Sequence, residues 1–217
     1  MMEVYDGEAL NILHTIGLDT LYPVIRIELE FSQSLSKSRF EHALKGVCKV
    51  VPEILYRYNM QTNQWFKITD KVFDLVIEDV RNVDEHAKEW DLMKNPQLRV
   101  YWNETTTGTR LIFYVSHILT DGAGSKQLLY LIAKAYTDGE NSIQNIRNNQ
   151  STEWLEKLVE KHQNTNDKKD NNLDELMSLP QIKSDTPTGL KVGSATLTKL
   201  QTEQLIQATH LAKVTVK

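Results

Sequence analysis

The sequence predicts an α/β protein in which a mixed β-sheet is covered by helices. Residues 111–115 are apolar at every position, which is typical of a strand in the middle of a sheet covered on both faces. Residues 24–31 alternate between apolar and charged side chains, which indicates a half-buried strand with one wet face. Two stretches, at about 39–50 and 125–136, place apolar residues three and four apart, which indicates helices with one side in the core.

The composition is that of an ordinary globular protein and excludes several functional classes. With 217 residues, 40% of them hydrophobic and 25% charged, the chain has enough apolar material for a core. A net charge of −4 without a basic patch argues against nucleic-acid binding. We find no membrane-spanning run and no apolar leader, so we expect a cytoplasmic protein. The single cysteine, Cys48, excludes an internal disulfide and a cysteine-cluster metal site.

Two helices are predicted in the N-terminal third, one before and one after the strand. A weak helical pattern covers residues 8–21 and includes His14, which we expect to be an ordinary satisfied or exposed histidine. The second helix, at about 39–50, follows a serine-rich turn, and Ser38 with the glutamate three residues later fits a capping box. Pro52 ends this helix, because proline lacks the N–H donor and disfavours helical backbone before it.

The middle of the chain predicts short strands and one short helix. Three strand-like segments follow one another, at 54–60, 64–69 and 73–80. The polar loop between the first two fits a hairpin. Residues 84–95 predict a short helix that Pro96 ends. Residues 97–104 and 108–117 then predict a second hairpin around a polar loop.

The composition of the chain becomes more polar after residue 137, and the expected domain organisation follows from this change. Residues 1–137 form the structured N-terminal subdomain. Residues 138–190 are polar, with one helical island at 154–158, and we expect a partly mobile connector, because residues 161–172 contain no apolar side chain. Residues 191–217 predict a further strand and helix.

The turn between the strand ending near residue 116 and the helix after it carries the chemistry. His117, Asp121 and Gly122 form an H-x-x-x-D-G pattern there. We expect Gly122 and Gly124 to supply backbone freedom at a sharp turn, and Ser125 to cap the helix. A histidine at such a junction is held by the scaffold while its ring faces a cleft.

Three kinds of chemistry fit this turn to different degrees. A metal pair of His117 and Asp121 would need a helix across both residues and a third ligand, and neither is evident. A nucleophilic triad with Ser116 is disfavoured, because neighbouring residues of a strand point to opposite faces. A general base at His117 fits best, since histidine titrates near neutral pH. A charge-assisted pair with an arginine would then hold Asp121.

These residues also resemble a known family. The sequence HILTDG, followed by a helix, resembles the HHxxxDG motif of the chloramphenicol-acetyltransferase-like superfamily, which includes non-ribosomal peptide condensation domains and alcohol acetyltransferases. Residues 24–58 are similar to the opening strand, long helix, proline and arginine-bearing strand of that family, and residues 197–217 look like the crossover to its second half. The resemblance covers most of the chain, but only the N-terminal half of a typical member.

The resemblance implies a role for each matching residue. His117 matches the general base that deprotonates an alcohol or amine acceptor, which then attacks the thioester of an acyl-CoA or a carrier-bound acyl group. Asp121 matches a structural aspartate that pairs with an arginine, for which Arg57 is the first candidate and Arg26 the second. Gly122 matches the glycine that lets the turn pack tightly. No metal and no permanently bound cofactor are implied.

Two departures from the family pattern define the functional hypotheses. Ser116 stands where the motif has its first histidine, and the DFGWG-type motif of the second half is absent. The leading hypothesis is therefore the histidine-bearing half of an acyltransferase, completed by a second half-domain or by self-association. The alternative is a non-catalytic binding or interaction domain that retains the fold. A trimeric acetyltransferase with sites between identical subunits is a third possibility.

Overall fold

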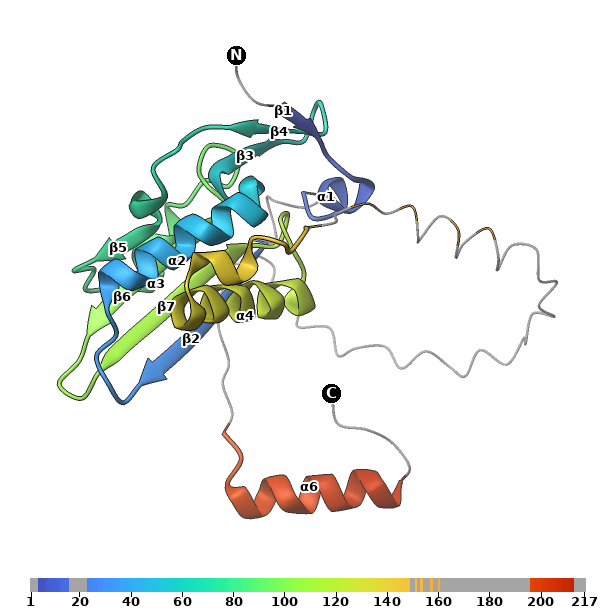
Figure 1. Ribbon diagram of the computed structural model, residues 1–217. Coiled ribbons are helices and arrows are strands. Elements are labelled where there is room, and N and C mark those ends of the chain that lie inside the picture. The colour runs from blue at the N-terminus through green and yellow to red at the C-terminus, as the bar shows by residue number, and fades with distance from the viewer. Residues whose placement is uncertain are drawn as a thin grey trace. The chain divides into compact units, whose positions relative to one another are not determined.

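The computed structural model describes residues 4–15, 23–148 and 196–212, together with residues 151, 153, 157 and 160 (Figure 1). The chain divides into two compact units, Met1–Asn166 and Asp167–Lys217. The strands of the first unit are β1 (Val4–Asp6), β2 (Val24–Phe31), β3 (Tyr56–Asn59), β4 (Gln64–Lys67), β5 (Val76–Glu78), β6 (Leu98–Glu104) and β7 (Thr109–Ser116). Its α-helices include α1 (Ala9–Leu13), α2 (Lys37–Val50), α3 (Val83–Lys88) and α4 (Gly122–Asp138), and its 3-10 helices are η1 (Pro52–Leu55), η2 (Val72–Leu75) and η3 (Glu140–Ile143).

The main sheet has the strand order β2-β7-β6-β5. β7 lies in its middle and runs antiparallel to β2 and β6, whereas β5 is parallel to β6, so the sheet is mixed. Every residue of β7 except Arg110 is buried. The predicted α/β class, the β2 strand at 24–31 and the hairpin of β6 and β7 are thereby confirmed.

A second, three-stranded sheet has the order β1-β4-β3. β3 and β4 form the hairpin that the sequence predicts, and Asn63 takes a positive φ of 50° in its turn. The rings of Tyr58 and Trp65 pack against each other across this hairpin and are fully buried. β1, which was not predicted, pairs with β4 in register from Val4 opposite Phe66, and this brings the following helix α1 next to the main sheet.

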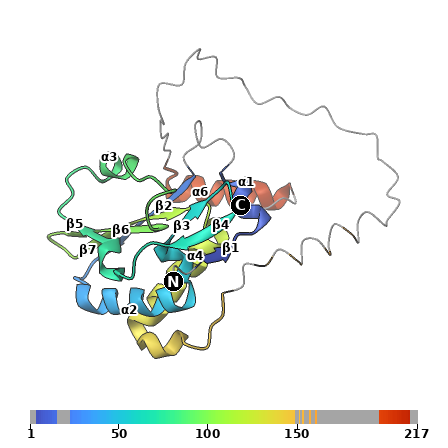
Figure 2. The same ribbon diagram turned by 90° about the horizontal axis from the view of Figure 1, so that it is seen from above.

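Helices α2 and α4 cover one face of the main sheet, and α3 lies on the other (Figure 2). Phe40 of α2 packs on Trp102 and Phe113 in the core. On the opposite face, Asp84 of α3 accepts a hydrogen bond from the Tyr114 hydroxyl. α3 ends at Lys88, well short of the predicted residue 95, and a turn follows.

The capping residue of α2 differs from the prediction. The helix begins at Lys37, two residues before the expected start, and Ser36 rather than Ser38 accepts a hydrogen bond from the Arg39 backbone N–H (3.4 Å). Ser38 lies inside the first turn, where its carbonyl is 2.6 Å from His42 Nδ1. The serine-rich turn offers several caps, and the local sequence did not distinguish between them.

The first unit continues beyond residue 137. α4 ends at Asp138, Gly139 takes a positive φ of 87°, and Ile143 of η3 is fully buried beside α2 and α4. The predicted helical island at 154–158 lies almost wholly outside the described residues, as does the polar run at 161–172.

In the second unit, the structure describes residues 196–212. The helix α6 (Lys199–Leu211) forms as predicted, with Thr198 as its N-cap. Of the strand expected at 191–198, residues 196–198 are non-regular and the others lie outside the described part. No helix among the described residues has a stretch long and apolar enough to cross a bilayer.

Candidate functional site

The His117 turn joins the central strand β7 to helix α4 and is held by backbone hydrogen bonds from several directions. The His117 N–H donates to the Pro23 carbonyl at 2.7 Å, which ties the turn to the start of β2. The Ser116 N–H donates to the Gln97 carbonyl at 2.9 Å. Ser116 itself is fully buried, and its Oγ accepts from the Ile118 N–H at 3.2 Å. Ser116 is therefore a structural residue of the turn and is not exposed as a nucleophile.

Asp121 is the N-cap of α4. Its Oδ1 accepts a hydrogen bond from the Gly124 N–H at 2.7 Å, and its side chain is exposed. The prediction that Ser125 caps this helix is wrong, because the helix begins three residues earlier, at Gly122. Ser125 is buried in the first turn and donates to the Gly122 carbonyl at 3.0 Å. Aspartate at an N-cap also interacts favourably with the helix dipole.

The two glycines of the turn have different surroundings. A Cβ added at Gly122 would have no atom within 4 Å, and Gly122 does not take a positive φ. The expected tight packing is therefore not found at Gly122. A Cβ added at Gly124 would lie 1.9 Å from Thr120 Oγ1. The close approach that requires a glycine is at Gly124, because the Thr120 side chain folds over the start of the helix.

Neither candidate arginine reaches Asp121. Arg57 lies on β3 in the three-stranded sheet, where its guanidinium stacks over the Phe66 ring at 4.9 Å. Arg26 lies on β2 and pairs with Glu28 (2.9 Å) and with Asp84 of α3 (3.0 Å), on the face of the sheet opposite to α4. Within the described part of the chain, no ion pair is formed by Asp121, and capping accounts for its position.

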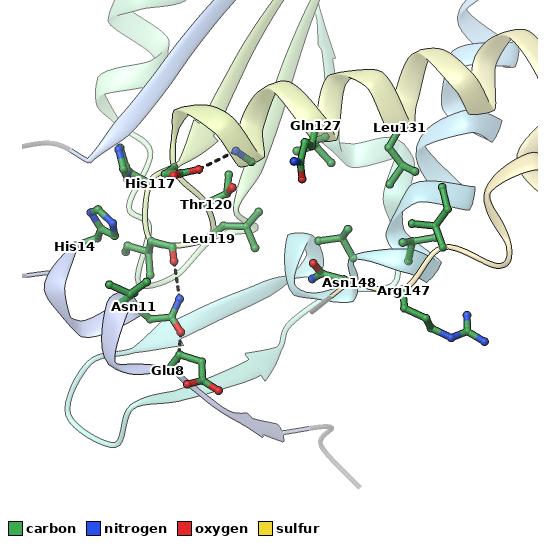
Figure 3. A pocket seen from close by; sticks show the side chains of 18 residues that line it. Glu8, Asn11, His14, His117, Leu119, Thr120, Gln127, Leu131, Arg147 and Asn148 are labelled. Carbon is green, nitrogen blue, oxygen red and sulfur yellow. Dashed lines mark hydrogen bonds between the residues drawn. The ribbon is translucent and has the colours of Figure 1, made fainter. Parts of the chain in front are cut away.

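His117 is half-buried and lines a pocket of about 390 Å³ (Figure 3). Its Nδ1 atom is buried and has no hydrogen-bond partner among the described residues. Its other ring nitrogen, Nε2, is not among the buried unpaired atoms of the described residues, and His117 is one of the residues that line the pocket. A base must come within hydrogen-bond reach of the proton that it takes, and a ring that lines the pocket can meet this condition for a bound ligand.

Helix α1 forms one wall of the pocket and is fixed to the His117 turn through Asn11. The Asn11 side chain is 6% exposed, its Nδ2 donates to the Ile118 carbonyl at 2.7 Å, and its Oδ1 accepts from the Glu8 N–H at 2.7 Å. Buried amides that satisfy both donor and acceptor in this way specify one arrangement of the segments they join. Asn11 therefore sets the position of α1 against the turn.

His14, at the C-terminal end of α1, lies directly beside His117. The two ring centroids are 4.1 Å apart and the ring planes are inclined by 37°. Burial lowers the pKa of His14, and the neighbouring His117 ring lowers it further, whereas the Asp121 carboxylate raises it. The expectation that His14 is an ordinary histidine without a role at the site therefore has to be revised.

The sequence of α1 contains a pattern that indicates its buried face, but the apolar periodicity of residues 8–21 points to the wrong face. Leu10 and Leu13 are more than 40% exposed, whereas Asn11 and Thr15 are buried and His14 is partly buried. The inward face of α1 is thus polar, and its members are spaced three and four residues apart. Reading that polar stripe instead of the apolar one would have identified the buried face.

The pocket has both apolar and polar walls. Leu119, Leu128, Leu131 and Ile146 line it together with the end of α2, and so do Thr120, Gln127 and Asn148. His14 and His117 lie at one end, and Arg147 lies near Leu131 at the other (Figure 3). No group of three or more histidine, cysteine, aspartate or glutamate side chains is placed to hold a metal ion in the part of the chain that the structure describes.

Sequence comparisons find neither a matching protein-family model nor a matching curated protein, but similar folds occur among solved structures. The tallysomycin biosynthesis protein TlmII superposes with a TM-score of 0.53 at 14% identity, over 74% of this chain and 44% of that chain. A starter condensation domain of rhizomide synthetase gives 0.45 at 12% identity, over 76% and 45%. F. graminearum TRI101, complexed with ethyl coenzyme A, gives 0.44 at 15% identity, over 63% and 40%.

The chain has an α/β fold similar to that of part of TlmII, with a mixed sheet covered by helices as the sequence predicts. It spans less than half of the length of each of these three proteins. An identity of 14% shows the fold alone. His117 and Asp121 of the H-x-x-x-D-G pattern lie at the junction of the central strand with α4 and line the pocket.

Proposed function

We propose that this half-domain carries the general base of an acyltransferase, with His117 as that base. The observation behind the proposal is that His117 lines the pocket while its Nδ1 is buried without a hydrogen-bond partner in the described residues, which leaves Nε2 as the nitrogen for proton transfer. The backbone of His117 is held at the end of the central strand by its hydrogen bond to the Pro23 carbonyl. A base fixed in this way is positioned without help from the substrate.

The proposed reaction transfers an acyl group from a thioester to a small alcohol or amine. Nε2 of His117 takes the proton of the acceptor as the acceptor oxygen or nitrogen bonds to the thioester carbonyl carbon. The carbon–sulfur bond then breaks, and the leaving thiolate receives the proton from Nε2. The thioester donor is an acyl-CoA or an acyl group on a carrier, which takes part as a co-substrate and is not permanently bound.

The walls of the pocket favour a substrate with an aliphatic part. Several leucine and isoleucine side chains line it, and burying apolar surface contributes about 25 cal/mol per Å². Arg147 lies at the end away from the histidines and is exposed there, where it can meet a polar or anionic group. We therefore expect medium-chain acyl groups or alcohols to be preferred over acetyl groups or ethanol.

The experiment is an assay of free CoA release from acetyl-CoA and octanoyl-CoA in the presence of a panel of alcohols and amines. The His117→Ala variant is compared with His42→Ala, which removes an exposed histidine of α2 outside the pocket. We expect His117→Ala to reduce turnover by about 100-fold or more, since general bases contribute on the order of 10²–10⁴. Absence of acceptor-dependent turnover in the folded wild-type chain would overturn catalysis by this chain alone.

A second candidate is an interaction module that requires a partner half-domain or another copy of itself. Helix α6 supports it, because its apolar side chains are exposed: Leu200 by 64%, Leu205 by 41%, Ile206 by 43% and Leu211 by 87%. Exposed apolar residues gathered on one helix often mark a protein–protein contact. Light scattering after size exclusion distinguishes the two candidates, since a discrete oligomer without turnover favours the module.

A further inference from the structure

Within the described residues, no hydrogen bond from a side chain or backbone group fixes the plane of the His117 ring. A catalytic histidine is usually oriented by a carboxylate or carbonyl that accepts from the nitrogen not used in the chemistry. In His117 that nitrogen is Nδ1, which is buried without a partner in the described residues. The residue in ring contact with it is His14, whose centroid lies 4.1 Å away. The two rings are in contact at an inclination of 37°, and no hydrogen bond joins them.

We propose that His14 is a positioning residue that holds the His117 ring by stacking, so that Nε2 faces the pocket. This inference rests on the proposed role of His117 as a base. Asn11 is the reason why His14 can serve in this way. Its buried hydrogen bond to the Ile118 carbonyl docks α1 on the turn, its bond from the Glu8 N–H caps α1, and the His14 ring thereby comes to lie beside His117. The aromatic contact substitutes for the missing hydrogen-bonded orienting group.

The charges around the pair indicate that His14 acts through contact and not as a proton carrier. Burial and the neighbouring His117 ring lower the pKa of His14, and the Asp121 carboxylate opposes this effect. Glu8 lines the same pocket from α1, and Arg147 lines its far end. A neutral His14 can stack on His117 without electrostatic repulsion, whereas two imidazolium rings in contact would repel each other.

The sign of the pH effect follows from this arrangement. Because the folded-state pKa of His14 is lowered from 6.5, the unfolded chain binds a proton at this residue more readily than the folded chain does. Its contribution to stability is therefore present above about pH 6.5 and is lost as the pH falls. His14→Phe removes this titration while it keeps an aromatic ring at the position.

The test compares His14→Ala, His14→Phe and, as a control on the exposed side of the same helix, Leu13→Ala. In the thioester assay we expect His14→Ala to lower kcat by about 10- to 100-fold with little change in KM, since small misplacements of a catalytic group cost this much. We expect His14→Phe to stay within about threefold of the wild type. Loss of activity in His14→Phe equal to that in His14→Ala, or no loss in either, would overturn the proposal.

A second readout separates this inference from the proposed function. The ring-current shift of the His117 Cε1 proton can be measured by NMR without any substrate. We expect it to change in His14→Ala and to remain close to the wild-type value in His14→Phe and Leu13→Ala. If these shifts behave as expected but no variant and no wild-type chain shows turnover, the acyltransferase function fails and the stacking stands. If His14→Ala leaves the shift unchanged, the stacking is refuted whether or not the chain is active.

Discussion

Replacing Asn11 by alanine should release α1 from the His117 turn without unfolding the rest of the protein. The substitution removes two hydrogen bonds of 2.7 Å, one to the Ile118 carbonyl and one from the Glu8 N–H. At a net value of about 1 kcal/mol each, their loss amounts to roughly 2 kcal/mol, which corresponds to an increase of about 30-fold in the opening equilibrium of the segment. Because α1 has only five residues, it is too short to be stable on its own and depends on such contacts.

Hydrogen–deuterium exchange of the peptide covering residues 4–15 measures this opening directly. We expect exchange of this peptide to rise in Asn11→Ala, while peptides from β6 and β7 exchange as in the wild type. Asn11→Asp is the matched variant, since it keeps an acceptor for the Glu8 N–H but sets a carboxylate against the Ile118 carbonyl. Its defect should lessen at low pH, where the protonated carboxyl can donate. Unchanged exchange of residues 4–15 in both variants would refute the view that Asn11 docks α1.

Two further predictions concern the turn and the core. Gly124→Ala should lower the free energy of unfolding by about 1–3 kcal/mol, because the new Cβ meets Thr120 Oγ1. Gly122→Ala should be neutral or stabilising by up to about 1 kcal/mol. Urea unfolding measures both changes in free energy. Equal effects of the two substitutions would contradict the assignment of the close approach to Gly124. Burial raises the pKa of Cys48 to about 12 from 9.0, so the native thiol should react with a thiolate-specific reagent at pH 8 about 1000-fold more slowly than in urea. The free energy of unfolding should also fall as the pH rises above about 9. Labelling of the native Cys48 thiol as fast as in urea would contradict the prediction.

The main sheet and its covering helices were predictable because their patterns are local. Alternation over residues 24–31 gives β2 with the observed bounds, and the run of apolar residues at 111–115 places β7 in the centre of the sheet. Each pattern records which side of its own segment is buried. The helix starts were less certain, since Ser36 and Asp121 are the caps where Ser38 and Ser125 were expected. Several residues near a helix start can cap it, and the choice depends on where the preceding strand or loop delivers the chain.

The candidate site was predictable at one residue and depended on tertiary structure for the rest. The H-x-x-x-D-G spacing identified His117 at the end of a strand, because motif and junction are adjacent in sequence. The contact of His14 with His117 joins segments far apart in the chain, and it exists because Asn11 docks α1 on the turn. The expected pair between Asp121 and Arg57 failed for the same reason, since β3 belongs to the other sheet. Sequence patterns determined which elements form and which faces they bury. Only packing between distant elements decided which side chains meet at the pocket, because that depends on shape and hydrogen bonding across the whole unit.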